Sequence, residues 1–394
     1  MTDRPLIRLN PGADRRIKSG HPWAFSNEIA MTATARAVPP GSVVRLEGDD
    51  GVKHGAWHFN PHSLIAARWL DEDPDAGCDA AWFRARLSEC LALRERLFDA
   101  PFYRLAHAEA DGLPGLVVDR YGDALAVQAN TAGMDRALPD ILAALQELVS
   151  PRVIVARNDA AVRRLEGLEE GVALLHGADG TAVVEEGGLS FPVDLLGGQK
   201  TGWFFDQRPN RALVARLAKG RSVLDAFCHL GGFGLAAAQA GAAQVTLLDR
   251  SEHALDLAMQ AAQRAGFGDR VVSLKAEALE QLERMVASGR KFDVVVADPP
   301  AFAKTRKDIP AALKGYAKLA RLAAGVTAKG GVLFIASCSH HVGPVDFADA
   351  VAWGLHRAKR RGKILASVGA GPDHPVHPAL PESAYLKGQL LALD

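Results

Sequence analysis

The chain has 394 residues, enough for two or three domains that each bury a core. Its 46 Lys and Arg residues balance its 46 Asp and Glu residues, so the net charge argues neither for nor against a nucleic-acid partner. The four cysteines show neither metal-ligand spacing nor disulfide-rich density, which predicts a cytoplasmic protein with no metal site. No stretch resembles a signal peptide or a membrane span, so we expect no membrane association.

Residues 1–75 contain short apolar runs broken by Pro and Gly, which predict a small β-rich domain. Alternating apolar residues over 43–46 and 66–70 predict two of its strands. Basic residues precede Trp23 and Phe25 in this domain: Arg8, Arg15, Arg16 and Lys18. Basic residues beside aromatic ones suit phosphate contact and base stacking. A solvated basic helix beside a buried Trp explains the same stretch equally well.

Residues 76–100 predict a linker helix, because apolar residues recur at helical spacing over 80–98. The arginines between them are typical of a solvated face. Residues 101–195 predict a small α/β middle domain with no sign of a catalytic site. Its expected elements are two strands joined around 121–123, a helix over 137–149, a strand over 153–156 and a hairpin with its turn at 185–188.

Residues 196–394 predict a larger α/β domain that opens with the segment GGQKTGWFFDQRPNR. Its polar residues are Gln199, Lys200, Thr201, Asp206, Gln207, Arg208 and Asn210. One interpretation is a loop that folds over a bound adenine, with Phe204 against the ring. The other is a hinge between domains. On the first interpretation we assign Phe204 and Arg208 to cofactor binding.

Residues 221–251 predict a strand, a glycine-bearing loop, a helix and a second strand. Asp225 ends the first strand and Asp249 ends the second. In open parallel sheets, ligands bind beyond the strand ends, where an acidic residue accepts hydrogen bonds from ribose hydroxyls. We therefore expect a ligand that contains ribose.

The loop of this unit favours S-adenosylmethionine over a dinucleotide. Phe227 and His229 stand where glycines would admit a pyrophosphate. Asp225 would repel a phosphate but suits the amino group of S-adenosylmethionine. A Rossmann-like unit that binds another nucleotide is the alternative.

The rest of the domain continues the alternation of helices and strands. The expected elements are a helix over 252–265, strands over 271–274, 292–297 and 331–336, a cation-rich helix over 356–363 and two closing strands. Polar residues follow the three strands: Glu277, Asp298 and Cys338. Because the carboxyl ends of parallel strands meet at one edge, we expect all three beside Asp225 and Asp249. Glu277 is the candidate contact for the adenine amino group.

Asp298, followed by Pro299, Pro300 and Phe302, fits two kinds of base recognition. The carboxyl group holds either an exocyclic amino group of a purine, with the aromatic ring stacked on the base, or the N3 edge of a pyrimidine. Cys338 distinguishes the two, because carbon 5 of cytosine becomes nucleophilic only after a thiolate adds to carbon 6.

A thiolate needs polar or cationic neighbours, and His340 and His341 are the nearest in sequence. A buried, inert cysteine is the alternative for Cys338 taken alone. Its place at a strand end beside Ser337, Ser339 and two histidines favours the functional interpretation.

DAFCHLGGFG, DPPAF and SCS, together with TGWFFDQRPNR and DHPVHPALPESAYLKG, resemble motifs of the bacterial ribosomal RNA large-subunit cytosine-5 methyltransferase family. The resemblance runs nearly end to end. It implies an N-terminal PUA RNA-binding domain, a small α/β middle domain and a Rossmann-like class I S-adenosylmethionine domain. It also implies ribosomal RNA (the 23S molecule) as the substrate. Whether the protein forms a homodimer stays open.

The resemblance extends to single positions. Cys338 matches the cysteine of the family's SCS motif, which implies the nucleophile, and Asp298 matches the acid that orients the base. The cofactor-binding residues expected are Phe204, Arg208, Asp225, Phe227, Gly231, Asp249, Ser251, Glu277, Ala278 and Asp298. The substrate-binding residues expected are Pro299, Pro300 and Phe302.

Two departures and two alternatives accompany this assignment. Related RNA methyltransferases carry a second cysteine for product release where this chain has Pro299, Pro300 and Ala301, so the base that removes the carbon-5 proton is unassigned. Glu277 stands where relatives often have Asp. A guanine methyltransferase of the same superfamily would lack Cys338. An inactive RNA-binding assembly factor would not need the acidic residues of the site.

Overall fold

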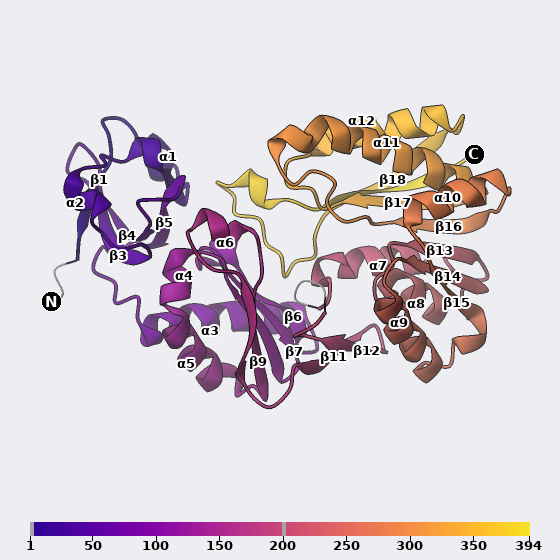
Figure 1. Cartoon of the computed structure of the whole chain (residues 1–394), viewed down its shortest axis with the longest axis horizontal. Helices are drawn as coiled ribbons and strands as arrows, with labels where there is room; N and C mark the ends of the chain where they lie inside the picture. Colours follow the sequence, from indigo (N-terminus) through magenta and orange to yellow (C-terminus); the bar gives the residue numbers. More distant parts are fainter. Residues whose placement is uncertain (1–3, 199–201) are drawn as a thin grey trace. The chain divides into compact units, whose positions relative to one another are not determined.

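The computed structural model describes residues 4–198 and 202–394, so Gln199, Lys200 and Thr201 of the polar segment lie outside the described residues. The chain divides into two compact units (Figure 1). The first contains Met1–Val184, Val193–Phe205 and Pro372–Ser383. The second contains Glu185–Pro192, Asp206–Gly371 and Ala384–Asp394.

The first unit begins with a five-stranded sheet and two short helices. In spatial order the strands are β1 (Leu6–Arg8), β3 (Ser42–Glu47), β4 (Lys53–Phe59), β5 (Ile65–Asp71) and β2 (Trp23–Phe25); the helices are α1 (Arg15–Lys18) and α2 (Ala33–Arg36). Trp57 and Phe59 of β4 are buried in its core. The two strands predicted in this region are confirmed.

A second five-stranded sheet follows in the same unit. Its strands in spatial order are β10 (Gly171–His176), β9 (Val153–Asn158), β8 (Ala124–Ala129), β7 (Leu116–Tyr121) and β6 (Phe102–His107); the helices are α3 (Ala80–Leu97), α4 (Ala132–Arg136), α5 (Leu138–Val149) and α6 (Val162–Leu165). α3 and α5 pack together and bury Phe83, Leu87, Ile141 and Leu145 in one core. The predicted helices over 80–98 and 137–149 are confirmed. A two-stranded sheet of β11 (Thr181–Glu186) and β12 (Leu189–Asp194) places its turn at Gly187 and Gly188, within the predicted range.

One arginine of α3 does not belong to a solvated face. Arg94 is fully buried, and its guanidinium donates to both carboxylate oxygens of Asp111, at 2.9 and 2.6 Å. It also donates to the backbone carbonyls of Arg104 and Asp373. Helical spacing assigned Arg94 to the surface, but the bidentate ion pair lets the charge stay inside.

The second unit is built on a seven-stranded sheet. Its strands in spatial order are β15 (Val271–Lys275), β14 (Gln244–Asp249), β13 (Ser222–Ala226), β16 (Phe292–Ala297), β17 (Thr327–Ser337), β19 (Lys387–Leu393) and β18 (Gly362–Val368). β13 to β17 pair in parallel, while β19 is antiparallel to both of its neighbours. The helices are α7 (Arg208–Ala215), α8 (Gly232–Gln239), α9 (Glu252–Arg264), α10 (Ala278–Ala287), α11 (Ile309–Val326) and α12 (Pro344–Arg357).

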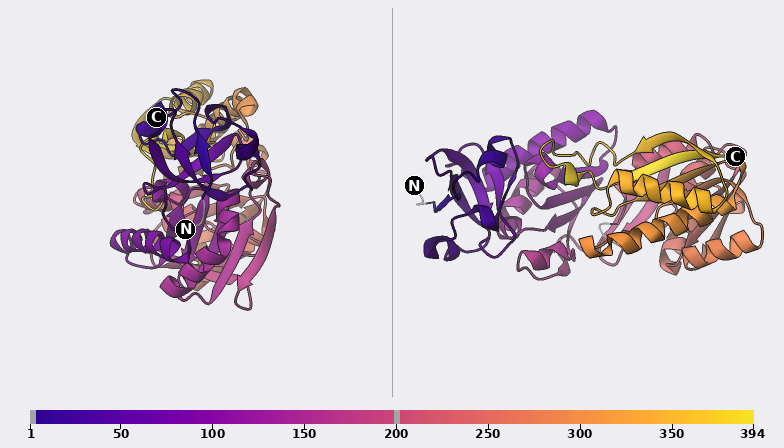
Figure 2. Two further views of the ribbon diagram at one scale, coloured as in Figure 1. Left: turned by 90° about the vertical axis from the view of Figure 1, so that its left-hand side faces the viewer. Right: turned by 90° about the horizontal axis from the view of Figure 1, so that it is seen from above.

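Helices cover both faces of this sheet, which is why its central strands are almost wholly apolar. α10, α11 and α12 lie on one face, and α7, α8 and α9 lie on the other (Figure 1). α11 and α12 run side by side in Figure 1 and in the right-hand view of Figure 2. The arrangement is Rossmann-like, as predicted, and brings the carboxyl ends of β13 to β17 to one edge of the sheet.

The predicted helix over 356–363 is wrong. α12 ends at Arg357, Lys359 adopts a left-handed φ of 54°, and the chain continues as strand β18. Phe347, Val351 and Leu355 of α12 are buried ahead of that point. Of the cations after it, Lys359 lies in a turn and Lys363 lies in β18. Pairing with β19 turns Gly362–Val368 into a strand. The two closing strands themselves are confirmed.

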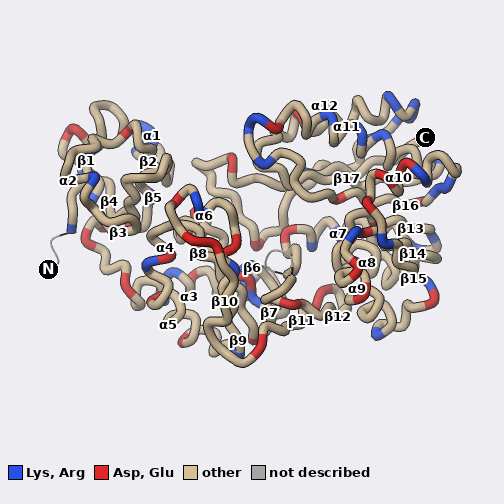
Figure 3. Tube along the Cα trace, viewed as in Figure 1, with Lys and Arg blue, Asp and Glu red and all other residues tan. Residues whose placement is uncertain are grey.

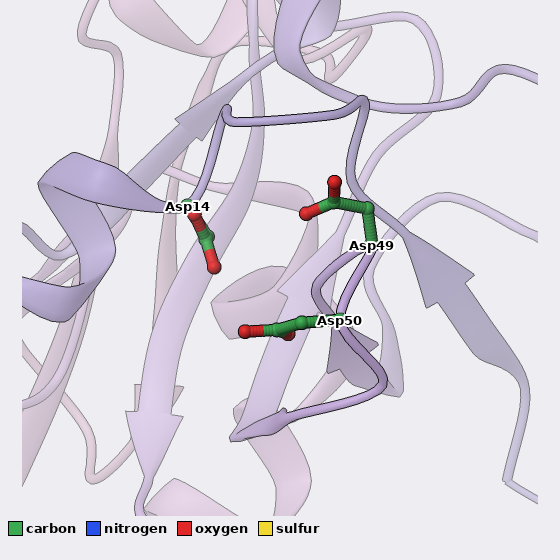
Figure 4. A group of neighbouring side chains, drawn as sticks. All are labelled: Asp14, Asp49 and Asp50. Carbon is green, nitrogen blue, oxygen red and sulfur yellow. The ribbon is translucent and has the colours of Figure 1, made fainter.

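Charges of both signs are spread over both units (Figure 3). Among the residues described, the carboxylates of Asp14, Asp49 and Asp50 form a group close enough to hold a cation (Figure 4). The ammonium of Lys18 already lies against Asp14 and Asp50 and supplies positive charge there. No helix in the described part of the chain is long and apolar enough to cross a membrane.

Candidate active site at the carboxyl edge of the sheet

The loop between β13 and α8 has an unusual backbone. Phe227 and His229 adopt left-handed φ angles of 62° and 51°, and Gly231, which precedes α8, has a φ of 75°. Only Gly231 adopts this conformation at little cost, because the other two carry a Cβ. Non-glycine residues held in this region cluster at ligand sites, so the loop is a strong candidate for cofactor contact.

Asp225 lies in β13 beneath this loop and is 1% exposed. The backbone N–H of Gly234 in α8 donates to its carboxylate at 2.7 Å. Burial raises the pKa of Asp225 to about 7, and the nearby charges of Asp298 and Asp249 act in the same direction. Three of the predicted acidic residues are therefore close enough to influence one another, as expected for adjacent parallel strands.

Asp249, at the end of β14, organises the loop from the other side. Its two carboxylate oxygens accept the backbone N–H groups of His229 and Ser251, each at 2.9 Å. The Ser251 hydroxyl in turn accepts the N–H of Ala254 and caps α9. Each carboxylate oxygen can accept a second hydrogen bond, so Asp249 can still bind two ribose hydroxyls.

Glu277 and Ala278 follow β15 at the start of α10. Asp249 and Lys275 are partners in the β14–β15 register, and Ala276 N donates to the Asp249 carbonyl at 3.0 Å. This pairing brings Glu277, in the connection between β15 and α10, close to the end of β14 at Asp249. Glu277 is exposed and Ala278 is buried. The Glu277 side chain does not cap α10 and is available to a ligand.

The described residues of the segment GGQKTGWFFDQRPNR, here called the entry segment (197–211), divide between the two units. Phe204 is half-buried and belongs to the first unit. Arg208 belongs to the second unit, where its guanidinium lies 3.4 Å from Glu186. Arg211 donates two hydrogen bonds to the same carboxylate. Both arginines thus lie against Glu186.

Asp298, directly after β16, has a partner that sequence analysis did not assign. Gln207 is 2% exposed and donates its amide to the Asp298 carboxylate at 2.9 Å. Asn210 donates to the Gln207 oxygen at 2.7 Å and to the Gly369 carbonyl at 3.0 Å. This chain of hydrogen bonds fixes the orientation of Asp298. In the sequence, the polar run DQRPN (206–210), which contains Gln207 and Asn210, was the only indication of this interaction.

Cys338 follows β17 and lies beside the loop that carries the prolines. Its Sγ is 3.9 Å from the carbonyl oxygen of Pro299, which is buried, whereas Pro300 is exposed. Phe302 of the same loop is half-buried and stacks on Tyr316, with ring centroids 4.7 Å apart. The predicted nucleophile and the predicted base-binding loop are therefore neighbours.

Tyr316 of α11 fixes the two serines that flank Cys338. Its hydroxyl lies 2.8 Å from the hydroxyl groups of both Ser337 and Ser339, and Ser339 also accepts the N–H of Ala303. All three hydroxyl-bearing side chains are fully buried, while Cys338 is only partly buried. The network holds the cysteine at the edge of the sheet with its thiol accessible.

The sequence matches the PUA-like domain family over residues 7–72 and the S-adenosylmethionine-dependent methyltransferase family over residues 168–383. The second match covers more than half of the chain. This protein belongs to the S-adenosylmethionine-dependent methyltransferases.

The sequences of known relatives align with nearly the whole length of this methyltransferase. It is 36% identical to ribosomal RNA large subunit methyltransferase I of Shewanella denitrificans over 97% of this chain and 98% of that protein. The Vibrio cholerae protein of the same name is also 36% identical, over 98% of each chain. The crystal structure of SMU.776 complexed with SAH has the same fold, with a TM-score of 0.83, 19% identity and coverage of 99% of each chain.

S-adenosylmethionine is the cofactor of this methyltransferase. The residues at the carboxyl edge suit that molecule. Asp249 offers acceptor positions for the ribose hydroxyls, and Asp225 offers a carboxyl group for the amino group of the methionine part. The cofactor supplies an electrophilic methyl group on a sulfonium.

The four cysteines of the methyltransferase, all in the described part of the chain, differ in environment. Burial raises the pKa of Cys78 to about 11, that of Cys90 to about 12 and that of Cys228 well above its ordinary value. Cys338 alone among the four is partly exposed. A reactive thiolate needs access and a favourable electrostatic environment, so Cys338 is the candidate nucleophile.

Proposed function

We propose that this methyltransferase acts on carbon 5 of a cytosine in the ribosomal RNA of the large subunit, through a covalent bond between Cys338 and carbon 6. The observation that carries the proposal is the accessible Cys338, 3.9 Å from the Pro299 carbonyl in the loop that begins with Asp298. The names of the relatives support a ribosomal RNA substrate. A ribosomal RNA substrate and four cysteines that form no disulfide within the described residues both fit a cytoplasmic location.

The proposed reaction begins when the Cys338 thiolate adds to carbon 6 of the cytosine. The bond that forms is S–C6, and the electrons of the C5–C6 double bond move onto carbon 5. Asp298 binds the N3 edge and stabilises the adduct, while Pro299, Pro300 and Phe302 contact the base. Carbon 5 would then take the methyl group: the C5–CH3 bond would form as the S–CH3 bond of the sulfonium breaks, which leaves a neutral thioether. A base removes the carbon-5 proton, the double bond re-forms and the thiolate leaves.

The cofactor-binding set proposed for this reaction keeps the residues expected from sequence. Asp225, Phe227, Gly231, Asp249 and Ser251 lie on or beside the loop after β13 and the end of β14. The set is completed by Phe204, Arg208, Glu277, Ala278 and Asp298. We propose that the PUA-like domain contributes to RNA binding.

Cys338→Ala tests the proposal. The variant should bind S-adenosylmethionine normally but transfer essentially no methyl group, because carbon 5 stays a poor nucleophile without the adduct. Cys228→Ala is the matched control: that thiol is buried, and we expect substantial activity. Methyl transfer is measured with labelled cofactor and large-subunit ribosomal RNA.

Trapping provides an independent measurement. RNA carrying 5-fluorocytosine at the target should form a stable covalent complex with the native enzyme, because fluorine cannot leave as a proton does. Cys338→Ala should form none. Near-native methylation by Cys338→Ala would reject the cytosine mechanism in favour of guanine methylation, which needs no thiol.

A further inference from the structure

Lys387 of the second unit carries a buried ammonium group, and the proposed reaction assigns no role to it. It begins β19, is 8% exposed, and donates from Nζ to the backbone carbonyls of Ser339 and Tyr385. Within the described ranges, no carboxylate lies at ion-pair distance from it. Buried lysines are rare without a carboxylate partner, because two carbonyl oxygens do not balance a full charge.

Strand pairing explains how Lys387 reaches this position. β19 runs antiparallel to β17, and Lys387 is the register partner of Ser337. The chain leaves β17 directly at Cys338, so the ammonium that binds the Ser339 carbonyl lies across the turn that carries the thiol. Burial lowers the pKa of Lys387 to about 8, and the charge of Cys338 opposes that effect. Lys387 and Cys338 are therefore electrostatically coupled.

Tyr316, His340 and His341 are three other titratable groups near Cys338, and none of the three supplies a buried positive charge. Tyr316 is a neutral hydroxyl, and burial raises its pKa. His340 and His341, the cations expected from sequence, are both exposed, and the His340 ring stacks on Tyr385 with centroids 4.9 Å apart. Asp298, one residue before Pro299, is acidic and disfavours a thiolate.

We propose that Lys387 is the positioning residue that keeps Cys338 in its thiolate form, with its ammonium held against the cysteine turn by two carbonyl groups. The inference rests on the proposed role of Cys338 as the nucleophile. A cation fixed in a poorly solvated place stabilises a nearby thiolate more than a solvated histidine does. Lys387 thereby supplies the activation that sequence analysis assigned to His340 and His341.

Lys387→Gln tests the inference, because glutamine still donates hydrogen bonds but carries no charge. The rate of Cys338 alkylation by iodoacetamide is measured against pH on the full-length protein, with the modified peptide identified by mass spectrometry. We expect the midpoint of the profile to rise by about one pH unit, with alkylation about tenfold slower near pH 7. Lys387→Arg retains a positive charge and should stay close to the native profile. The same profile in the native protein and in Lys387→Gln would overturn the inference.

A second measurement needs no substitution in the site. In native protein with carbon-13-labelled lysine, the Lys387 pKa is followed by NMR before and after alkylation of Cys338. Removing the thiolate should lower the Lys387 pKa, and an unchanged value would contradict the coupling.

Neither experiment uses RNA. If Cys338→Ala proves active while the coupling holds, only the proposed function fails; if Cys338→Ala is inactive and the profiles coincide, only this inference fails.

Discussion

Asp225, which we propose binds the amino group of S-adenosylmethionine, is a buried carboxyl group with a raised pKa. Its carboxyl group is 1% exposed, and burial raises its pKa to about 7. Asp298 and Asp249 add negative charge nearby, while the Gly234 N–H and the charge of Arg211 favour ionisation. The ligand-free protein therefore carries a proton on Asp225 at mildly acid pH. A bound ammonium group favours the carboxylate, so that proton must leave on binding.

This proton predicts a pH dependence of cofactor affinity. Below pH 7 the cost of ionising Asp225 is added to binding, so affinity should fall by up to about tenfold per pH unit. Calorimetric titration with S-adenosylmethionine at pH 5.5 and 7 should show weaker binding at the lower pH, with a proton released. Asp225→Asn should bind weakly at both values with no such slope. Equal affinity of the native protein at both pH values would exclude this role for Asp225.

At the scale of elements, the contact of α8 with β14 depends on a glycine. A Cβ on Gly234 would lie 2.3 Å from a methyl group of Leu247 and 3.0 Å from one of Val245. Neither strand residue can retreat, because both are fully buried. The close approach also lets the Gly234 N–H reach Asp225. Helix packing and the geometry of the loop between β13 and α8 therefore depend on the same residue.

Gly234→Ala should push α8 away from the sheet. We expect a loss of about 1–3 kcal/mol in unfolding free energy, as for other overpacked cores, together with weaker binding of S-adenosylmethionine. Urea denaturation and calorimetry measure the two effects. Gly268→Ala is the control, because its added methyl group would meet only Gln263 at 3.5 Å, an ordinary contact. Native stability and affinity in Gly234→Ala would show that α8 adjusts without cost.

At the scale of the whole molecule, the basic stretch near the N-terminus offers less free charge than its sequence suggests. Arg8 pairs with Glu47, Arg16 pairs with Glu28, and Lys18 pairs with Asp14 and Asp50. Arg16 also lies over the Phe25 ring. Arg15 is exposed and has no ion pair within the described residues. It is the cation of this stretch best able to bind a phosphate.

Arg15→Ala should weaken the binding of ribosomal RNA and make its salt dependence shallower. Loss of one phosphate contact reduces the slope of log K against log salt concentration by about 0.7–0.9. Filter binding across a salt series measures the slope, and Arg15→Lys should preserve it. Cofactor affinity should not change. An unaltered slope in Arg15→Ala would move the RNA contacts to other surfaces.

The sequence by itself determined the outline of the candidate active site. Strands and helices alternate from residue 222 onward, and parallel strands must end at one edge of their sheet. A polar residue at the carboxyl end of each strand, or directly after it, therefore reaches the same edge, whatever the details of packing. Asp225, Asp249, Asp298 and Cys338 were all predictable for this reason.

Only the tertiary structure decided which groups act on those residues. Lys387 reaches the Cys338 turn because β19 enters the sheet antiparallel between β17 and β18, a register that no local pattern specifies. Gln207 reaches Asp298 through a contact between distant segments. The same limit explains the wrong helix over 356–363 and the burial of Arg94. The pattern of charges along the sequence describes a single segment. Strand pairing and ion pairing depend instead on which other segment the fold brings next to that one.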